Sequence, residues 1–142
     1  MLIGAWTTEG IELNGNVYRL DDLEGFEDLY AGIILGVRED GTFTILDGIF
    51  RIEGDWITSW KEGTEHAYTL QAKTVIRFKI ENGEFVTVSE QAKTTQYRVW
   101  MPGEDPNTII VSDPDSPYPL YYVREGMESS YLAENSAVPP GD

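Results

Sequence analysis

Apolar and polar residues alternate along most of this chain with a period of two, in short segments separated by turns. Residues 33–38, 42–46, 85–89 and 97–101 follow this pattern, which is typical of β-strands that bury one face. Glu81-Asn82-Gly83 is the clearest of the hairpin turns between them, because Asn-Gly readily adopts the turns that join antiparallel strands. The rhythm predicts about eight to ten antiparallel strands, in line with all-β folds built from many short strands.

One segment departs from this period. Between residues 20 and 31, apolar side chains recur every three or four positions, and acidic residues crowd the start. This spacing predicts a short amphipathic helix between the first strand (2–8) and the second (33–38). Gly25, in the middle of this segment, disfavours a continuous helix, so two separate turns remain the alternative. The residues before it, 9–17, contain two glycines and two asparagines, and they are predicted to form a loop.

The strand pattern predicts a closed sheet. Open antiparallel sheets of this length expose edges that invite aggregation, and closure removes them. We therefore predict an up-and-down β-barrel over residues 1–126, with a two-sheet sandwich as the alternative. Residues 68–80 fit either one bent strand or two strands. The pattern is lost after Glu125, so residues 127–142 are predicted to be a flexible tail.

Composition restricts the class of protein. The 142 residues suit one domain, and 41% hydrophobic with 12% aromatic residues can form a core. The absence of cysteine excludes disulfides, thiolate metal sites and cysteine nucleophiles. No nucleotide-binding glycine loop or other cofactor motif occurs, and no cofactor is predicted.

The net charge of −15 opposes binding to nucleic acid and to anionic membrane surfaces. No apolar run approaches the roughly 18 residues of a membrane span. No signal peptide is visible, and the first predicted strand begins at Leu2. We expect a cytoplasmic protein as the chain stands, or an envelope or secreted protein if this is a trimmed mature form. No protein partner can be named from the sequence.

Two short motifs mark the ends of the predicted barrel: Gly4-Ala5-Trp6 and Tyr122-Val123-Arg124. Together with the turn at Asp40-Gly41-Thr42-Phe43 and the stretch at residues 110–115, they resemble lipocalins, and above all the small bacterial lipocalin-like, calycin-type domains. The resemblance implies that the tryptophan lies under the barrel floor and that the arginine stacks across it. It assigns Gly4, Trp6, Tyr122 and Arg124 to this floor, where an indole plugs the narrow end and a guanidinium gains cation–π attraction.

A set of aromatic residues in the central strands is the candidate ligand site. Rigid aromatic side chains at a barrel mouth suit flat apolar ligands. An eight-strand barrel is also narrow enough for side chains to fill it, so cavity lining and simple packing both remain open. The predicted ligand-binding residues are Phe50, Trp56, Trp60, Tyr68, Phe78 and Trp100.

No catalytic or metal centre is predicted. His66 is the single histidine, and no nucleophile motif accompanies it, so we interpret it as a surface residue. Asp105, Asp113 and Asp115 lack the spacing of a calcium loop and are interpreted as turn residues. We therefore predict a non-enzymatic barrel that binds a small apolar or amphipathic molecule. The alternative is a packed barrel that serves as a protein-interaction or accessory module.

Overall fold

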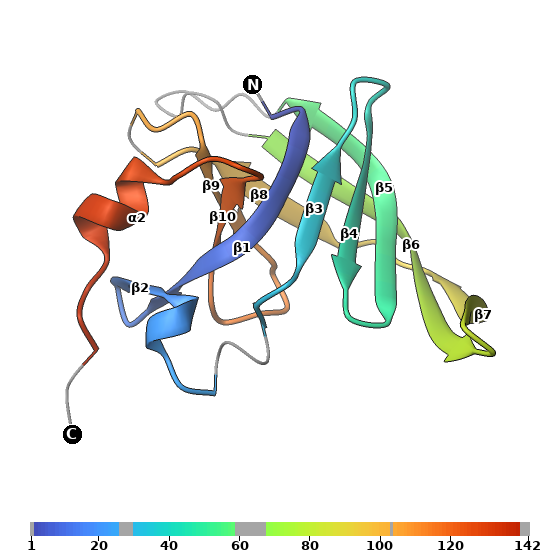
Figure 1. The fold of residues 1–142 in the computed structure, drawn as a ribbon. Coiled ribbons are helices and arrows are strands. Elements are labelled where there is room, and N and C mark those ends of the chain that lie inside the picture. The colour runs from blue at the N-terminus through green and yellow to red at the C-terminus, as the bar shows by residue number, and fades with distance from the viewer. Residues whose placement is uncertain (1, 26–29, 59–67, 103, 140–142) are drawn as a thin grey trace.

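Eight strands close into an antiparallel barrel in the computed structural model (Figure 1), which describes residues 2–25, 30–58, 68–102 and 104–139. Around the barrel the strands follow the order β1, β3, β4, β5, β6, β8, β9 and β10, and β10 pairs with β1 to close the ring. The predicted all-β barrel is therefore confirmed, and the sandwich alternative is wrong. Closure leaves no exposed edge within the ring.

Ten strands and two short helical segments lie in the described part of the chain. They are β1 (Gly4–Leu13), β2 (Asn16–Arg19), the 3-10 helix η1 (Leu20–Asp22), β3 (Ile34–Val37), β4 (Thr42–Asp47), β5 (Phe50–Thr58), β6 (Tyr68–Glu81), β7 (Glu84–Ala92), β8 (Gln96–Trp100), β9 (Thr108–Ser112), β10 (Leu120–Arg124) and α2 (Ser130–Asn135).

The first strand is longer than its apolar pattern predicted. β1 continues to Leu13 and turns through Asn14-Gly15 into β2, so the loop predicted over residues 9–17 is wrong. Both turn residues have positive φ, 52° and 82°, as a two-residue hairpin turn requires. The helical segment η1 follows β2 and not the first strand. Residues 26–29 of the predicted helix lie outside the described residues.

β6 is a single long strand, which answers the question left open for residues 68–80. Its pairing with β5 shifts at Gly54, so that Lys73 is an extra residue on the β6 side. The two strands approach closely there: a Cβ at Gly54 would lie only 1.9 Å from the carbonyl oxygen of Gln71. A bulge of this kind bends a strand and increases its twist, which helps β6 to curve out of the barrel wall.

The core lies in two places. Most buried apolar side chains fill the barrel interior, among them Trp6, Phe43 and Leu70. A second cluster lies on the outside of the barrel wall, where α2 covers it with Leu132, a side chain that is 0% exposed. The ring of Tyr131 stacks on that of Tyr121 at 5.7 Å.

The segment predicted to be a flexible tail therefore includes a packed helix. The sequence signal was weak, because α2 has six residues and too few turns to show a clear apolar period. Among the residues described, no helix has both the length and the apolar character needed to cross a membrane.

Candidate binding sites

The floor of the barrel has the contact that the terminal motifs predicted. The guanidinium carbon of Arg124 lies 4.2 Å from the centroid of the Trp6 ring, and Arg124 Nη1 donates to the carbonyl of Ile3 at 2.7 Å. Trp6 Nε1 donates to the carbonyl of Leu2 at 2.9 Å. Gly4 has φ of 138°, and a Cβ there would lie 2.7 Å from Arg124 Nη1. Only glycine leaves room for the arginine.

Tyr122, the fourth residue assigned to the floor, lies further up the barrel. Its partner in the sheet is Thr8, whereas Arg124 pairs with Trp6. Tyr122 is buried and lines a hollow at the other end of the interior. Successive inward positions on one strand are two residues apart, so Tyr122 lies one inward position further from the floor than Arg124.

Among the described residues, the predicted ligand-binding aromatics do not form one cavity. Trp56 and Tyr68 contact each other edge to face at 6.0 Å and pack against the interior core. Trp56 Nε1 donates to the carbonyl of Arg38 beside the β3–β4 turn. This pair therefore contributes packing near the floor.

Trp100, another member of the set, lies on the outside of the barrel wall. Its side chain packs against the outer cluster under α2. Tyr97 and Val99, on the same strand, face inward, and Trp100 directly follows Val99. The alternation itself signals this, since a strand side chain beside an inward residue points outward. Trp60 lies outside the described residues, as does His66.

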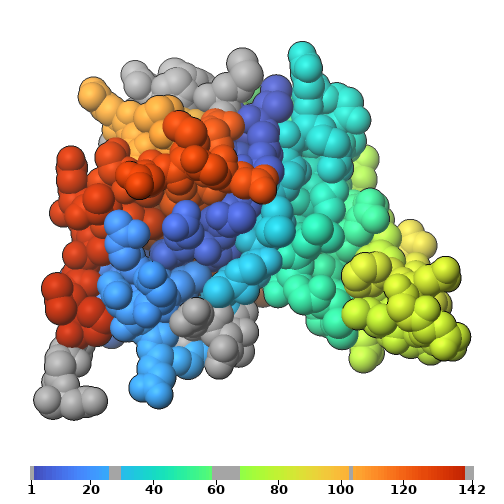
Figure 2. All heavy atoms as spheres, viewed as in Figure 1, coloured from blue at the N-terminus to red at the C-terminus, as the bar shows by residue number. Residues whose placement is uncertain are grey.

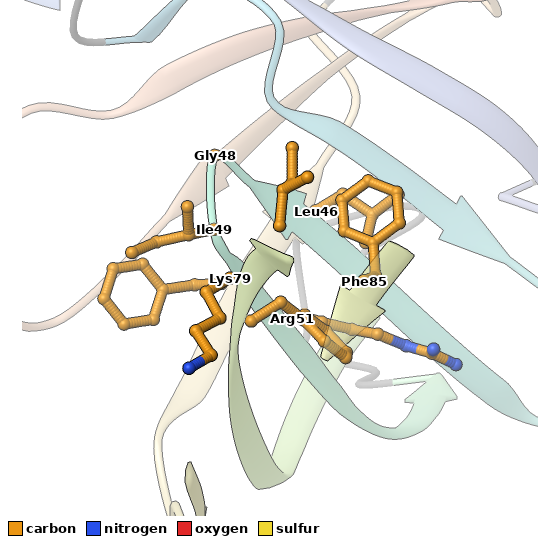
Figure 3. A pocket seen from close by; sticks show the side chains of 9 residues that line it. Leu46, Gly48, Ile49, Arg51, Lys79 and Phe85 are labelled. Atoms are coloured by element: carbon orange, nitrogen blue, oxygen red, sulfur yellow. The ribbon is translucent and has the colours of Figure 1, made fainter. Parts of the chain in front are cut away.

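Phe50 and Phe78 line a groove outside the barrel (Figure 3). This outer groove has a volume of about 400 Å³ and lies between the β4–β5 hairpin and the far end of β6 and β7. Its walls are mostly apolar, with two basic side chains at the rim. The lining residues are Leu46, Gly48, Ile49, Phe50, Arg51, Phe78, Lys79, Ile80 and Phe85.

A smaller hollow of about 150 Å³ remains inside the barrel, at the mouth opposite the floor. We call it the mouth hollow. Its apolar walls include inward residues of β4, β5 and β9. Four tyrosines, two aspartates and one serine supply its polar side chains: Tyr30, Tyr97, Tyr118, Tyr122, Asp47, Asp113 and Ser116.

Burial and negative charge shape the chemistry of the mouth hollow. Burial raises the pKa of Tyr97, and the nearby carboxylate of Asp113 raises it further. Burial likewise raises the pKa of Tyr122, so both hydroxyls remain protonated at neutral pH. Burial also raises the pKa of Asp47 above its ordinary value. The mouth hollow thus presents aromatic faces and hydroxyls beside carboxylates, a combination suited to a positively charged molecule.

Asp105 has a structural role that the sequence did not reveal. One of its oxygens accepts from Thr108 Oγ1 at 2.6 Å and from the Tyr131 backbone N–H at 3.0 Å, and the other accepts from the Asn107 N–H at 2.9 Å. Burial would raise the pKa of Asp105, but these hydrogen bonds outweigh it and hold the pKa below its ordinary value. Asp105 therefore ties α2 to β9.

Asp113 and Asp115 occupy a turn, in which Asp113 accepts from the Asp115 N–H at 2.8 Å. Within the described residues, no group of three or more histidine, cysteine or acidic side chains is arranged to hold a metal ion. Comparisons with protein-family models, with curated proteins and with solved structures find no match for this chain.

Proposed function

We propose that this protein is a non-enzymatic, lipocalin-like binding protein that holds a small amphipathic molecule in the mouth hollow. The observation that carries the proposal is the set of four tyrosines and two aspartates around a hollow of about 150 Å³. The floor contact between Trp6 and Arg124 supports the lipocalin-like assignment. The ligand class follows from charge and size.

The charge of the site favours an organic cation. Aromatic faces attract cations, and the attraction grows where water is excluded. Asp47 and Asp113 add negative charge at the rim. The net charge of −15 raises the local concentration of cations around the whole protein.

The size of the site favours a compact ligand. A dry cavity of about 150 Å³ in another protein accommodates benzene, so the mouth hollow suits one small ring or a quaternary ammonium group. Long apolar ligands do not fit, because core side chains fill the rest of the interior. The proposed ligand is therefore a small amine or quaternary ammonium compound with apolar substituents.

Calorimetric titration with choline tests this function. We expect saturable binding of choline and much weaker binding of 3,3-dimethylbutan-1-ol, its neutral isostere, because only the cation gains from the carboxylates. The double variant Asp47→Asn/Asp113→Asn should weaken choline binding by about tenfold, which corresponds to about 1.4 kcal/mol. Binding should also weaken as the pH falls through the pKa of Asp47, where its carboxylate becomes neutral.

Asp115→Asn provides the matched control. It removes one negative charge from the same turn, but Asp115 does not line the mouth hollow. Equal binding of choline and its neutral isostere would contradict the proposal, as would equal losses in the Asp115 and Asp113 single variants. The alternative function, a protein-interaction module, is favoured by the exposed apolar side chains of the outer groove.

A further inference from the structure

The far part of the β6–β7 hairpin projects from the barrel (Figures 1 and 2). We call residues 73–93 the arm; the hydrogen bond from Lys93 N–H to the Lys73 carbonyl closes its base. β5 pairs with β6 only as far as Arg77, and the tip beyond it is a two-stranded ribbon. Such ribbons have little stability by themselves.

β7 is an edge strand of the sheet. Among the described strands it pairs with β6 alone. Its residues are exposed except for the half-buried Ser89. Natural edge strands usually carry lysine, proline or inward charges that block pairing with other chains, yet residues 85–89 read Phe-Val-Thr-Val-Ser. A bulge interrupts the run at Val88, because the partners of β6 change from Ser89 to Thr87 between Arg77 and Phe78. Residues 84–87 are therefore the part of this edge that is open to a further strand.

The arm also carries large apolar side chains beside a hollow that fits such groups. Ile80 is 71% exposed and Phe85 is 77% exposed. Both line the outer groove together with Leu46 and Phe50 from the β4–β5 hairpin (Figure 3). Apolar patches of this kind on soluble proteins mark interaction sites.

The charge of the arm favours a second copy of the same chain as the partner. The arm has four basic and three acidic side chains, a formal charge of +1, which leaves −16 for the rest of the chain. Because the rest of the chain carries the negative charge, two copies repel each other less where their arms meet than they do on average elsewhere. Identical edges also match each other across a two-fold axis.

We propose that this protein forms a symmetric dimer in which the β7 strands of two copies pair antiparallel, so that the exposed apolar side chains of each β7 lie beside those of its partner. The register that places Val86 on the two-fold axis sets Phe85 opposite Thr87 and uses the part of β7 that precedes the bulge at Val88. Pairing extends each two-stranded arm into a four-stranded sheet, and three or more strands with an apolar face are stable where two are not.

Sedimentation equilibrium over a range of protein concentrations tests the dimer. We expect the wild-type mass to approach twice 16.0 kDa. Phe85→Glu should raise the dimer dissociation constant at least 100-fold, because it places a charge in the interface. Val138→Glu makes a comparable charge change at an exposed apolar residue outside the arm and should leave the dimer intact. Far-UV circular dichroism verifies that both variants fold.

A single cysteine tests the register. The chain contains no cysteine, so Val86→Cys, at the residue on the two-fold axis, should give a disulfide-linked dimer under mild oxidation. Ala133→Cys, exposed on α2, should not. A wild-type mass of 16.0 kDa at every concentration would overturn the proposal, as would equal effects of the Phe85 and Val138 substitutions. Binding of a detergent-like amphiphile to a monomer would instead assign the outer groove to a small molecule.

Discussion

Removal of the Trp6 side chain should destabilise the barrel severely, because this residue closes its floor. Trp6 is 0% exposed, and its ring supports the guanidinium of Arg124 at 4.2 Å. Replacing a buried tryptophan with alanine typically costs about 3–5 kcal/mol. The lost cation–π contact is worth about 0.5–1 kcal/mol where it is partly exposed. We therefore expect Trp6→Ala to fall near the upper end, at about 4–5 kcal/mol.

That loss is large beside the roughly 5–15 kcal/mol that stabilises most domains. At about 3–4 °C per kcal/mol for a chain of this size, it corresponds to a fall in Tm of roughly 12–20 °C. Urea unfolding followed by far-UV circular dichroism measures the loss, since tryptophan fluorescence would change with the substitution itself. All variants need one fixed protein concentration, because the proposed dimerisation would add to apparent stability.

Two further experiments separate the floor contact from general core packing. Val138→Ala, at a side chain that is 89% exposed, should stay within about 0.5 kcal/mol of wild type. A double-mutant cycle with Trp6→Leu and Arg124→Ala should give a coupling of about 0.5–1 kcal/mol. A loss below about 1 kcal/mol for Trp6→Ala, the usual level at surface sites, would refute the assignment of Trp6 as the floor plug.

Two other substitutions test how the fold is held together. Gly54→Ala should cost about 1–3 kcal/mol, because the new Cβ would lie 1.9 Å from the Gln71 carbonyl oxygen; Gly36→Ala, whose nearest neighbour is 4.0 Å away, is the control for urea unfolding. Asp105→Asn should cost about 1–3 kcal/mol at pH 7 by weakening the hydrogen bonds to the carboxylate, including the one from Thr108. Because the folded-state pKa of Asp105 is lowered, its contribution is complete above the ordinary value of 3.8 and is lost as the pH falls through the folded-state pKa. Urea unfolding at pH 7 and pH 3 should therefore show the difference from wild type shrinking in acid, and a constant difference would contradict the role assigned to this carboxylate.

The residues that the sequence predicted best are those whose roles depend on local spacing. Gly4 and Trp6 lie two apart on one strand, so they share a face wherever that strand lies. Arg124 could be joined to them through a resemblance of motifs, and the structure has the contact. The Asn14-Gly15 hairpin also had a local signal, which the loop interpretation overlooked.

The aromatic set shows where local pattern fails. Phe50, Trp56 and Phe78 all lie on alternating strands, yet Trp56 packs near the floor while Phe50 and Phe78 line the outer groove. The bulge at Gly54 adds Lys73 to β6 and reverses which side its later positions face, which accounts for Phe78. β5 gains no residue there, and Phe50 lines the groove as the first residue of that strand. A change of one residue in register moves every following side chain to the other face of a sheet.

The sequence by itself determined the strand pattern, the antiparallel barrel and the floor motif, because each depends on the period of two and on turns a few residues long. Only the tertiary structure decided what the barrel encloses and what it exposes. The mouth hollow gathers tyrosines and aspartates from segments as distant as Tyr30 and Tyr122, and the arm exists because β6 extends beyond β5. These features depend on strand register and on the relative lengths of neighbouring strands. Both are set by contacts between residues far apart in the chain, which a local pattern does not record.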